Sequence, residues 1–160
     1  MLRPKPKKAP MMKAQPAAIA RAQSSRYVLN DQVGFLMRVA MQRHTAIFMS
    51  RMVDGLTQTQ FAALAKLFEV GACSQNQLGR LIYLDAATIK GVVDRLRARG
   101  LIAIGHDPQD RRRLAVMLTA AGRRVAESAI AVAAEITAAT LAPLGTTEQR
   151  AVVRLLKKLG

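Results

Sequence analysis

The chain has 160 residues, of which 51% are hydrophobic, so it is long enough to bury a core and is not disordered as a whole. Its formal net charge of +15 at pH 7 favours a polyanionic partner. A single cysteine excludes an internal disulfide framework, and no apolar run reaches the ~18 residues of a membrane helix. We therefore expect a cytoplasmic protein that does not insert into a membrane.

The first 28 residues are expected to form a flexible basic tail. Residues 1–26 hold four of the six prolines and seven of the 25 basic residues, with no acidic residue. From Leu29 onward, hydrophobic residues recur at spacings of three and four. This pattern predicts a long helix within residues 29–56, capped by Asn30 or Asp31 and ended by Gly55.

Three later helix starts have the sequence of a capping box, in which a hydroxyl and a glutamine side chain bond to backbone amides. Each box predicts the first turn of a helix. The boxes are Thr57 with Gln60, opening a helix to about Val70 before Gly71; Ser74 with Gln77, opening a short helix to about Tyr83; and Thr146 with Gln149, opening the final helix.

Two apolar runs, residues 101–104 and 114–118, predict short strands within this helical succession. The loop between them contains two carboxylates, a proline and three consecutive arginines. It is therefore expected to be the charged tip of a hairpin. An alanine-rich helix is predicted after the hairpin, over residues 120–141, stopping before Pro143. The fold class is thus mainly α with a small β-hairpin.

The segment from Ser74 to Gly100 predicts two helices joined by a tight connection. Asp85 is the expected N-cap of the second helix, and Gly100 is the residue expected after its end. Residues 89, 92, 93 and 96 define its buried face, while small residues occupy the opposite face. A short helix, a tight turn and a helix with such a face indicate a helix-turn-helix, whose second helix enters the DNA major groove.

Hydroxyl and cationic side chains beside that small-residue face are suited to phosphates and base edges. The hairpin would supply a wing whose arginines reach the adjacent minor groove. Asp107 and Asp110 are expected to orient these arginines, Asp110 by pairing with Arg112 or Arg95, and Asp94 is expected to pair with Arg97. The predicted DNA-binding residues are Ala87, Thr88, Lys90, Gly91 and Arg95 on the helix and Arg111, Arg112 and Arg113 on the wing.

Three motifs together resemble the MarR family of bacterial transcriptional regulators. They are the valine-aspartate-arginine-leucine run from Val93, the wing pattern from Asp107 to Arg112, and the leucine-threonine and glycine from Leu118 to Gly122. The resemblance covers roughly residues 30–160. It implies a homodimer that binds pseudo-palindromic operators through a winged helix-turn-helix, residues 57–119. Residues 29–56 and 120–160 would form the helical dimerisation region.

The resemblance also implies release of DNA when a small, often aromatic, ligand binds between the two regions. The first long helix carries methionines and phenylalanines that suit either a dimer core or a ligand pocket. Cations beside this apolar stripe would hold an anionic aromatic compound or the phosphates of its coenzyme A thioester. The predicted ligand-binding residues are Arg38, Met41, His44, Phe48 and Arg51.

Catalysis, cofactors and metal binding are not expected. The two histidines, His44 and His106, have no partner at metal-ligand spacing, and no phosphate-binding glycine loop or nucleophile elbow is present. Two functions therefore stay open. One is a ligand-responsive repressor, and the other is an architectural protein that binds nucleic acid without regard to sequence.

Overall fold

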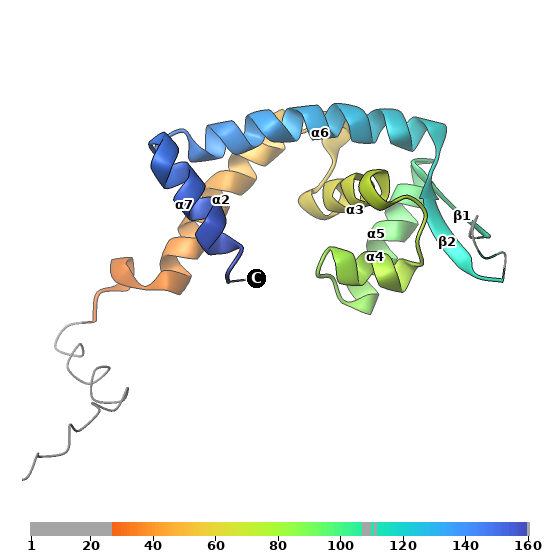
Figure 1. The fold of residues 1–160 in the computed structure, drawn as a ribbon, viewed down its shortest axis with the longest axis horizontal. Coiled ribbons are helices and arrows are strands. Elements are labelled where there is room, and N and C mark those ends of the chain that lie inside the picture. Colours follow the sequence, from red (N-terminus) through yellow and green to blue (C-terminus); the bar gives the residue numbers. More distant parts are fainter. Residues whose placement is uncertain (1–26, 107–109, 111, 160) are drawn as a thin grey trace, which may run out of the picture. The chain divides into compact units, whose positions relative to one another are not determined.

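A computed structural model describes residues 27–106, 110 and 112–159. The chain divides into two compact units, Met1–Val39 and Ala40–Gly160. In chain order the elements are η1 (Leu29–Asp31), α2 (Val33–Arg51), η2 (Val53–Gly55), α3 (Gln58–Val70), α4 (Gln75–Leu81), α5 (Ala86–Ala98), β1 (Ile102–His106), β2 (Leu114–Leu118), α6 (Ala120–Leu141) and α7 (Thr146–Leu156) (Figure 1). The mainly α fold with a β-hairpin wing is confirmed. The tail of residues 1–26 lies outside the described residues.

The start of the first long helix was predicted wrongly. Residues 29–31 form a 3-10 turn, and Gln32 is extended, so the α-helix begins at Val33 and neither Asn30 nor Asp31 caps it. Its end differs too, because Met52 is extended and Gly55 closes the separate turn η2. Met52 and Leu56 point into the core, with 9% and 1% of their surface exposed. Burying these two side chains favours breaking the helix over continuing it.

The capping predictions for α3 and α5 are confirmed, and for α4 the Ser74 cap is confirmed without the reciprocal bond from the Gln77 side chain. Gln60 N–H donates to the Thr57 hydroxyl and the Gln60 side chain accepts from Thr57 N–H, which completes the capping box. Gln77 N–H donates to the Ser74 hydroxyl at 3.2 Å. In α7 the prediction is off by one residue. Gly145 is the N-cap, and its N–H donates to Glu148, while Gln149 donates to the carbonyls of Leu141 and Leu144.

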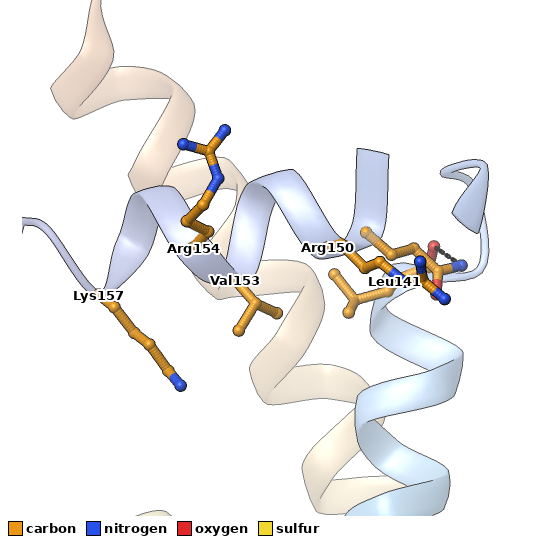
Figure 2. Close-up of a pocket in the computed structure, with 6 residues that line it drawn as sticks. Leu141, Arg150, Val153, Arg154 and Lys157 are labelled. Carbon is orange, nitrogen blue, oxygen red and sulfur yellow. Dashed lines mark hydrogen bonds between the residues drawn. The ribbon is translucent and has the colours of Figure 1, made fainter. Parts of the chain in front are cut away.

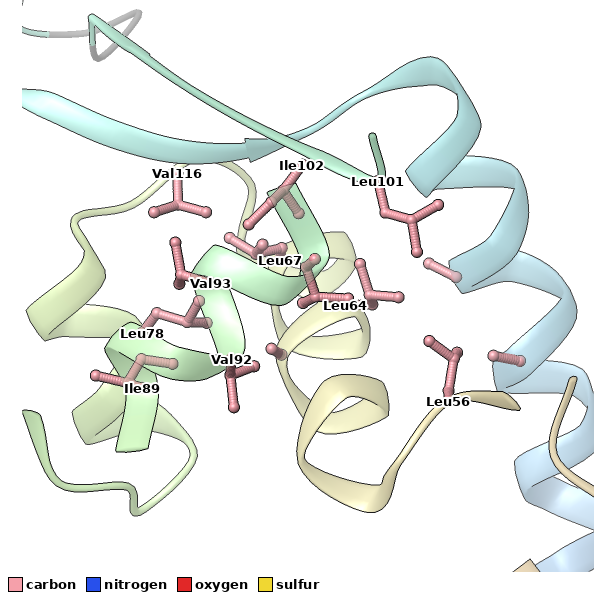
Figure 3. Packing of buried hydrophobic residues seen from close by; sticks show 14 of the residues in the cluster. Leu56, Leu64, Leu67, Leu78, Ile89, Val92, Val93, Leu101, Ile102 and Val116 are labelled. Carbon is pink, nitrogen blue, oxygen red and sulfur yellow. The ribbon is translucent and has the colours of Figure 1, made fainter. Parts of the chain in front are cut away.

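One apolar core joins the helix-turn-helix to the hairpin and to α6 (Figure 3). The predicted buried face of α5 is confirmed, since its four residues are at most 1% exposed. They pack with leucines of α3 and α4 and with the base of the hairpin. The labelled core residues are Leu56, Leu64, Leu67, Leu78, Ile89, Val92, Val93, Leu101, Ile102 and Val116.

The two strands pair antiparallel, with Ile102 opposite Leu118 and His106 opposite Leu114. The first strand begins one residue later than predicted and runs two residues further, to His106. At the base of the hairpin, Thr119 N–H donates to the carbonyl of Leu101 at 3.1 Å, one position before the Ile102–Leu118 pair. On the other edge of β2, Val116 and Cys73 exchange two backbone hydrogen bonds of 2.8 and 3.2 Å. The hairpin is thus closed at its base by Thr119 and attached along β2 to the segment before α4.

A tight contact connects the residues directly after α5 to the start of α6. The Thr119 hydroxyl donates to the carbonyl of Gly100 at 2.7 Å and accepts from Gly122 N–H at 3.0 Å, so it caps α6 and holds the start of β1. A Cβ on Gly122 would lie 1.8 Å from the carbonyl oxygen of Leu101. Only glycine fits at this position.

No single helix in the described part of the chain is long and apolar enough to span a membrane; α6 and α7 meet the length and composition requirement only together, with a 110° bend between them.

Gly122→Ala is expected to lower the free energy of unfolding by about 3 kcal/mol or more, because the new methyl group meets backbone atoms that cannot move aside. Gly34→Ala is the matched control, since nothing lies within 4 Å of the point that its Cβ would occupy and alanine favours helix. Urea unfolding of both variants measures the difference. Equal stability of the two variants would contradict the contact.

Candidate nucleic-acid interface and ligand cavity

The N-terminus of α5 is organised by Asp85. One of its carboxylate oxygens accepts from Thr88 N–H at 2.9 Å, and the other accepts from the Thr88 hydroxyl at 2.6 Å. The bond from the Thr88 hydroxyl, followed by the bond from its backbone amide, lowers the pKa of Asp85 below its ordinary value. Asp85 is therefore ionised at neutral pH. The hydroxyl proton of Thr88 is used within the helix, which leaves the Thr88 oxygen as an acceptor.

The outer face of α5 is accessible and smooth. Ala87, Thr88, Lys90 and Arg95 are exposed, and Gly91 is half-buried. A Cβ on Gly91 would lie 3.3 Å from a guanidinium nitrogen of Arg95, which shows that the arginine lies across the glycine. The structure therefore brings the five predicted helix residues onto one surface.

Asp94 pairs with a different cation from the one predicted. Its carboxylate accepts from the Lys90 ammonium at 2.7 Å, one helical turn earlier, and not from Arg97. This bond is the main reason why the pKa of Asp94 lies below its ordinary value, with smaller contributions from the charges of Lys90, Arg97 and Arg95. The pairing holds the lysine along the helix axis.

The wing tip is shaped by Asp110. Its side chain accepts from the backbone N–H of Arg112 at 3.1 Å, and its carbonyl accepts from Arg113 N–H at 2.9 Å. Asp110 thus orders the turn through the main chain, in the manner of an Asx turn. Among the described residues, no ion pair joins it to the guanidinium of Arg112 or Arg95, the partners predicted for it. Arg112 and Arg113 are exposed. Asp107 and Arg111 lie outside the described residues.

Sequence reasoning missed Tyr83 in the turn between α4 and α5. Its φ is +56°, a value that residues other than glycine adopt rarely, and 86% of its surface is exposed. The sequence signal that could have marked Tyr83 is its large polar side chain at a position inside a tight turn. Its hydroxyl is a suitable donor to a phosphate.

A cavity of about 310 Å³ lies between the C-terminal part of α2, α3 and α6. Three of the predicted ligand residues line it. The His44 and Phe48 rings lie 6.3 Å apart, and the Phe48 and Phe61 rings 6.0 Å apart, so aromatic rings form one side. The lining residues are Met41, His44, Phe48, Gln58, Phe61, Ala133, Ile136 and Thr137.

The other two predicted ligand residues do not line this cavity. The Arg38 guanidinium lies 5.0 Å from the centre of the Phe35 ring within the first unit, and Arg51 is exposed. The residues contributed by α3 and α6 were not predicted. Gln58 carried no signal beyond its place in a capping sequence, and Thr137 lies in an alanine-rich stretch in which no polar pattern marks one face.

A second hollow, of about 570 Å³, lies at the C-terminal end of the chain (Figure 2). Arg150, Arg154 and Lys157 extend from α7 around the apolar side chains of Val153 and Leu141. It is larger, but it is more open, and apart from Leu141 at the end of α6 its lining comes from α7 and the residue after it. The smaller cavity is formed by side chains of three helices and lined with aromatic rings, so it has the character of a ligand site.

Metal chemistry has no evident site: within the described ranges, no three His, Cys, Asp or Glu side chains form a group that could hold an ion.

Comparison with known proteins agrees with this geometry. A model of the MarR family matches residues 56–114. The HTH-type transcriptional repressor NicR of Pseudomonas putida is 38% identical over 150 residues, which are 93% of this chain and 95% of that protein. A probable transcriptional regulator from Pseudomonas aeruginosa is 53% identical, with a TM-score of 0.79, over 83% of this chain and all of that one.

A third similar protein has a described ligand. BpsR of Bordetella bronchiseptica is 43% identical to this chain, with a TM-score of 0.77, over 84% of this chain and 96% of that one. Its structure was solved to explain how 6-hydroxynicotinic acid regulates its DNA binding.

Thr88→Val should raise the pKa of Asp85 toward its ordinary value, because the strongest bond to the carboxylate is lost. A carboxyl group whose pKa is lower in the folded chain than in the unfolded chain stabilises the fold at pH values above its unfolded-state pKa of about 3.9. This stabilisation is lost as the pH falls through the folded-state pKa. Between about pH 6 and about pH 3, the free energy of unfolding of the wild type should therefore fall by more than that of Thr88→Val. Carboxyl NMR titration and acid unfolding test this, with Thr88→Ser as the control that keeps the hydroxyl.

Proposed function

Because this chain belongs to the MarR family of winged helix-turn-helix transcriptional regulators, we propose that it is a repressor whose DNA binding responds to a small aromatic acid. It binds a pseudo-palindromic operator as a homodimer in the cytoplasm and releases it when the acid occupies the cavity between α2, α3 and α6. The observation that carries this proposal is the exposed surface of α5, with a wing bearing arginines directly after it.

The α5 surface is suited to base readout in the major groove. Ala87 and Gly91 allow close approach, while Thr88 and Arg95 offer an acceptor and a donor on either side. Lys90, paired with Asp94, is better placed for phosphates than for bases. Arg112 and Arg113 are then available to the flanking minor groove. Asp107 and Arg111 are proposed to take part in the same wing.

Homodimerisation is supported by apolar side chains that a lone chain leaves in water. In the first unit Val33, Leu36 and Met37 are at least half exposed, and in the second unit Leu155 and Leu156 are similarly exposed. Apolar surface of this extent at both ends of the chain favours an interface with another copy. We propose that residues 29–56 and 120–160 form the dimerisation region, and that residues 57–119 bind DNA.

The cavity favours a free aromatic acid over a coenzyme A thioester as the effector. Its volume of about 310 Å³ is near the lower end of the usual range for ligand pockets, which suits one substituted ring. BpsR, whose DNA binding is regulated by 6-hydroxynicotinic acid, supports a ligand of this size. Met41, His44 and Phe48 would contact it directly. A contribution from Arg38 or Arg51 to holding its charge stays a prediction.

The proposed function is tested by fluorescence anisotropy at ~0.15 M salt, where non-specific binding is weak. The protein is titrated into DNA from upstream of its own gene and into a shuffled duplex of equal composition. We expect preference for the upstream DNA and release of that complex by 6-hydroxynicotinic acid or a related aromatic acid. Equal binding to both duplexes, and to operators found by unbiased selection, would favour the architectural alternative.

Arg112→Ala is expected to weaken operator binding by about 1–3 kcal/mol, the scale of one good groove contact. Lys158→Ala removes an equal charge from the C-terminal end and serves as the control, with an expected loss well below that of Arg112→Ala. Both are measured by the same titration. Binding of the Arg112 variant at wild-type strength would remove the wing from the mechanism.

A further inference from the structure

The hydrogen bonds around Thr140 favour one tautomer of His44. The Thr140 hydroxyl donates to the carbonyl of Ile136 at 2.8 Å. His44 Nδ1 lies 2.9 Å from the same hydroxyl oxygen. A threonine hydroxyl has one proton, which the Ile136 carbonyl accepts, so toward His44 the oxygen acts as an acceptor. This arrangement favours the tautomer of His44 in which Nδ1 carries the proton between the two side chains.

Arg43, the neighbour of His44 on α2, binds the main chain of the same segment. Its guanidinium donates to the carbonyl of Thr140 at 3.0 Å and to that of Ala139 at 3.4 Å. The consecutive residues Arg43 and His44 thus hold Thr140 by its main chain and by its side chain. This double attachment fixes the Thr140 oxygen relative to the imidazole ring.

The tautomer has a consequence for the cavity that His44 lines. Since Nδ1 is bound to Thr140, any hydrogen bond between the ring and an occupant of the cavity must use Nε2. In the neutral ring with a proton on Nδ1, Nε2 is an acceptor. We propose that Thr140 is a positioning residue that holds His44 in the Nδ1–H tautomer, so that Nε2 selects effectors with a hydrogen-bond donor on the aromatic ring.

The other polar groups of the lining support the same selection. The Thr137 hydroxyl donates to the carbonyl of Ala133 at 2.9 Å, so its oxygen is also left as an acceptor. The Gln58 amide nitrogen lies 3.4 Å from the Thr45 hydroxyl, which leaves the Gln58 carbonyl oxygen available. These groups suit a ring hydroxyl or a ring N–H. This inference rests on the proposed function, because it requires that the effector binds in this cavity.

The tautomer is measured first, without effector. Long-range ¹H–¹⁵N NMR of the full ¹⁵N-labelled chain distinguishes a protonated ring nitrogen from an unprotonated one, and His44 and His106 are the two histidines to assign. The spectrum is recorded at about pH 8.5, two units above the ordinary histidine pKa of about 6.5. We expect a protonated Nδ1 in the wild type and in Thr140→Ser, and a mixture of tautomers in Thr140→Val. Thr137→Val, which removes a hydroxyl bound to its own helix in the same way, should leave the His44 signals unchanged.

Effector selection is measured by calorimetry with 6-hydroxynicotinic acid and nicotinic acid, which differ by the ring donor. The wild type and Thr140→Ser should bind 6-hydroxynicotinic acid at least roughly tenfold more tightly than nicotinic acid. Nicotinic acid has no ring donor, so it leaves Nε2 of His44 without a hydrogen bond. Thr140→Val should lose most of this preference. Operator affinity without effector should be the same for all three proteins, which excludes a general structural defect.

The outcomes separate this inference from the proposed function. A wild-type His44 protonated on Nε2 overturns the role of Thr140, even if aromatic acids bind and release DNA. Equal discrimination by Thr140→Val and the wild type overturns the selection step. A wild type that binds neither acid, nor any other hydroxylated aromatic acid, contradicts the proposed effector and the selection with it, whereas the NMR result still decides what Thr140 does to His44.

Discussion

The close contact between Gly122 and the carbonyl of Leu101, with the Thr119 hydroxyl beside it, is the constraint on which the DNA-reading part of the molecule depends. Three parts of the chain meet at this contact. They are the residues directly after α5, the base of the hairpin and the first turn of α6. Because no side chain fits between them, the wing and the recognition helix keep one orientation relative to α6. The leucine-threonine and glycine motif of the sequence is therefore a packing requirement.

That constraint gives α6 a mechanical role. The helix runs without a break from Ala120 to Leu141, a length of about 33 Å at the standard rise. Its first turn is fixed to the wing, and its later turns supply Ile136 and Thr137 to the cavity and Thr140 to His44. Under the proposed function, a ligand that displaces the later turns would also move the first turn of α6 and the hairpin attached to it. Binding in the cavity and binding of DNA are thus expected to compete for positions of the same helix.

Local chemistry made much of this architecture predictable, and long-range packing accounts for the rest. Thr57, Asp85 and Gly100 mark helix ends through bonds within a few residues, so their roles follow from the sequence. The break at Met52 is decided by tertiary burial, which periodicity cannot show. The residues around the start of α2 at Val33 are exposed, and nothing in the structure explains why the helix begins there. Asp94 has basic residues before and after it in the sequence, and only the side-chain rotamers in the folded chain decide which of them it pairs with. The cavity was predicted for its α2 side alone, because its other walls come from residues far along the chain that carry no distinctive motif.

The two backbone hydrogen bonds between Cys73 and Val116 also protect the wing from other chains. A two-stranded hairpin has two open edges, each of which can template unwanted pairing with a neighbouring polypeptide. Here the outer edge of β2 is occupied at its base by the segment before α4. The part that extends beyond this bridge leads to a tip with exposed arginines, whose mutual repulsion opposes stacking of wings. The hairpin therefore protrudes with one of its two edges already paired within its own chain, which lowers its tendency to nucleate aggregation.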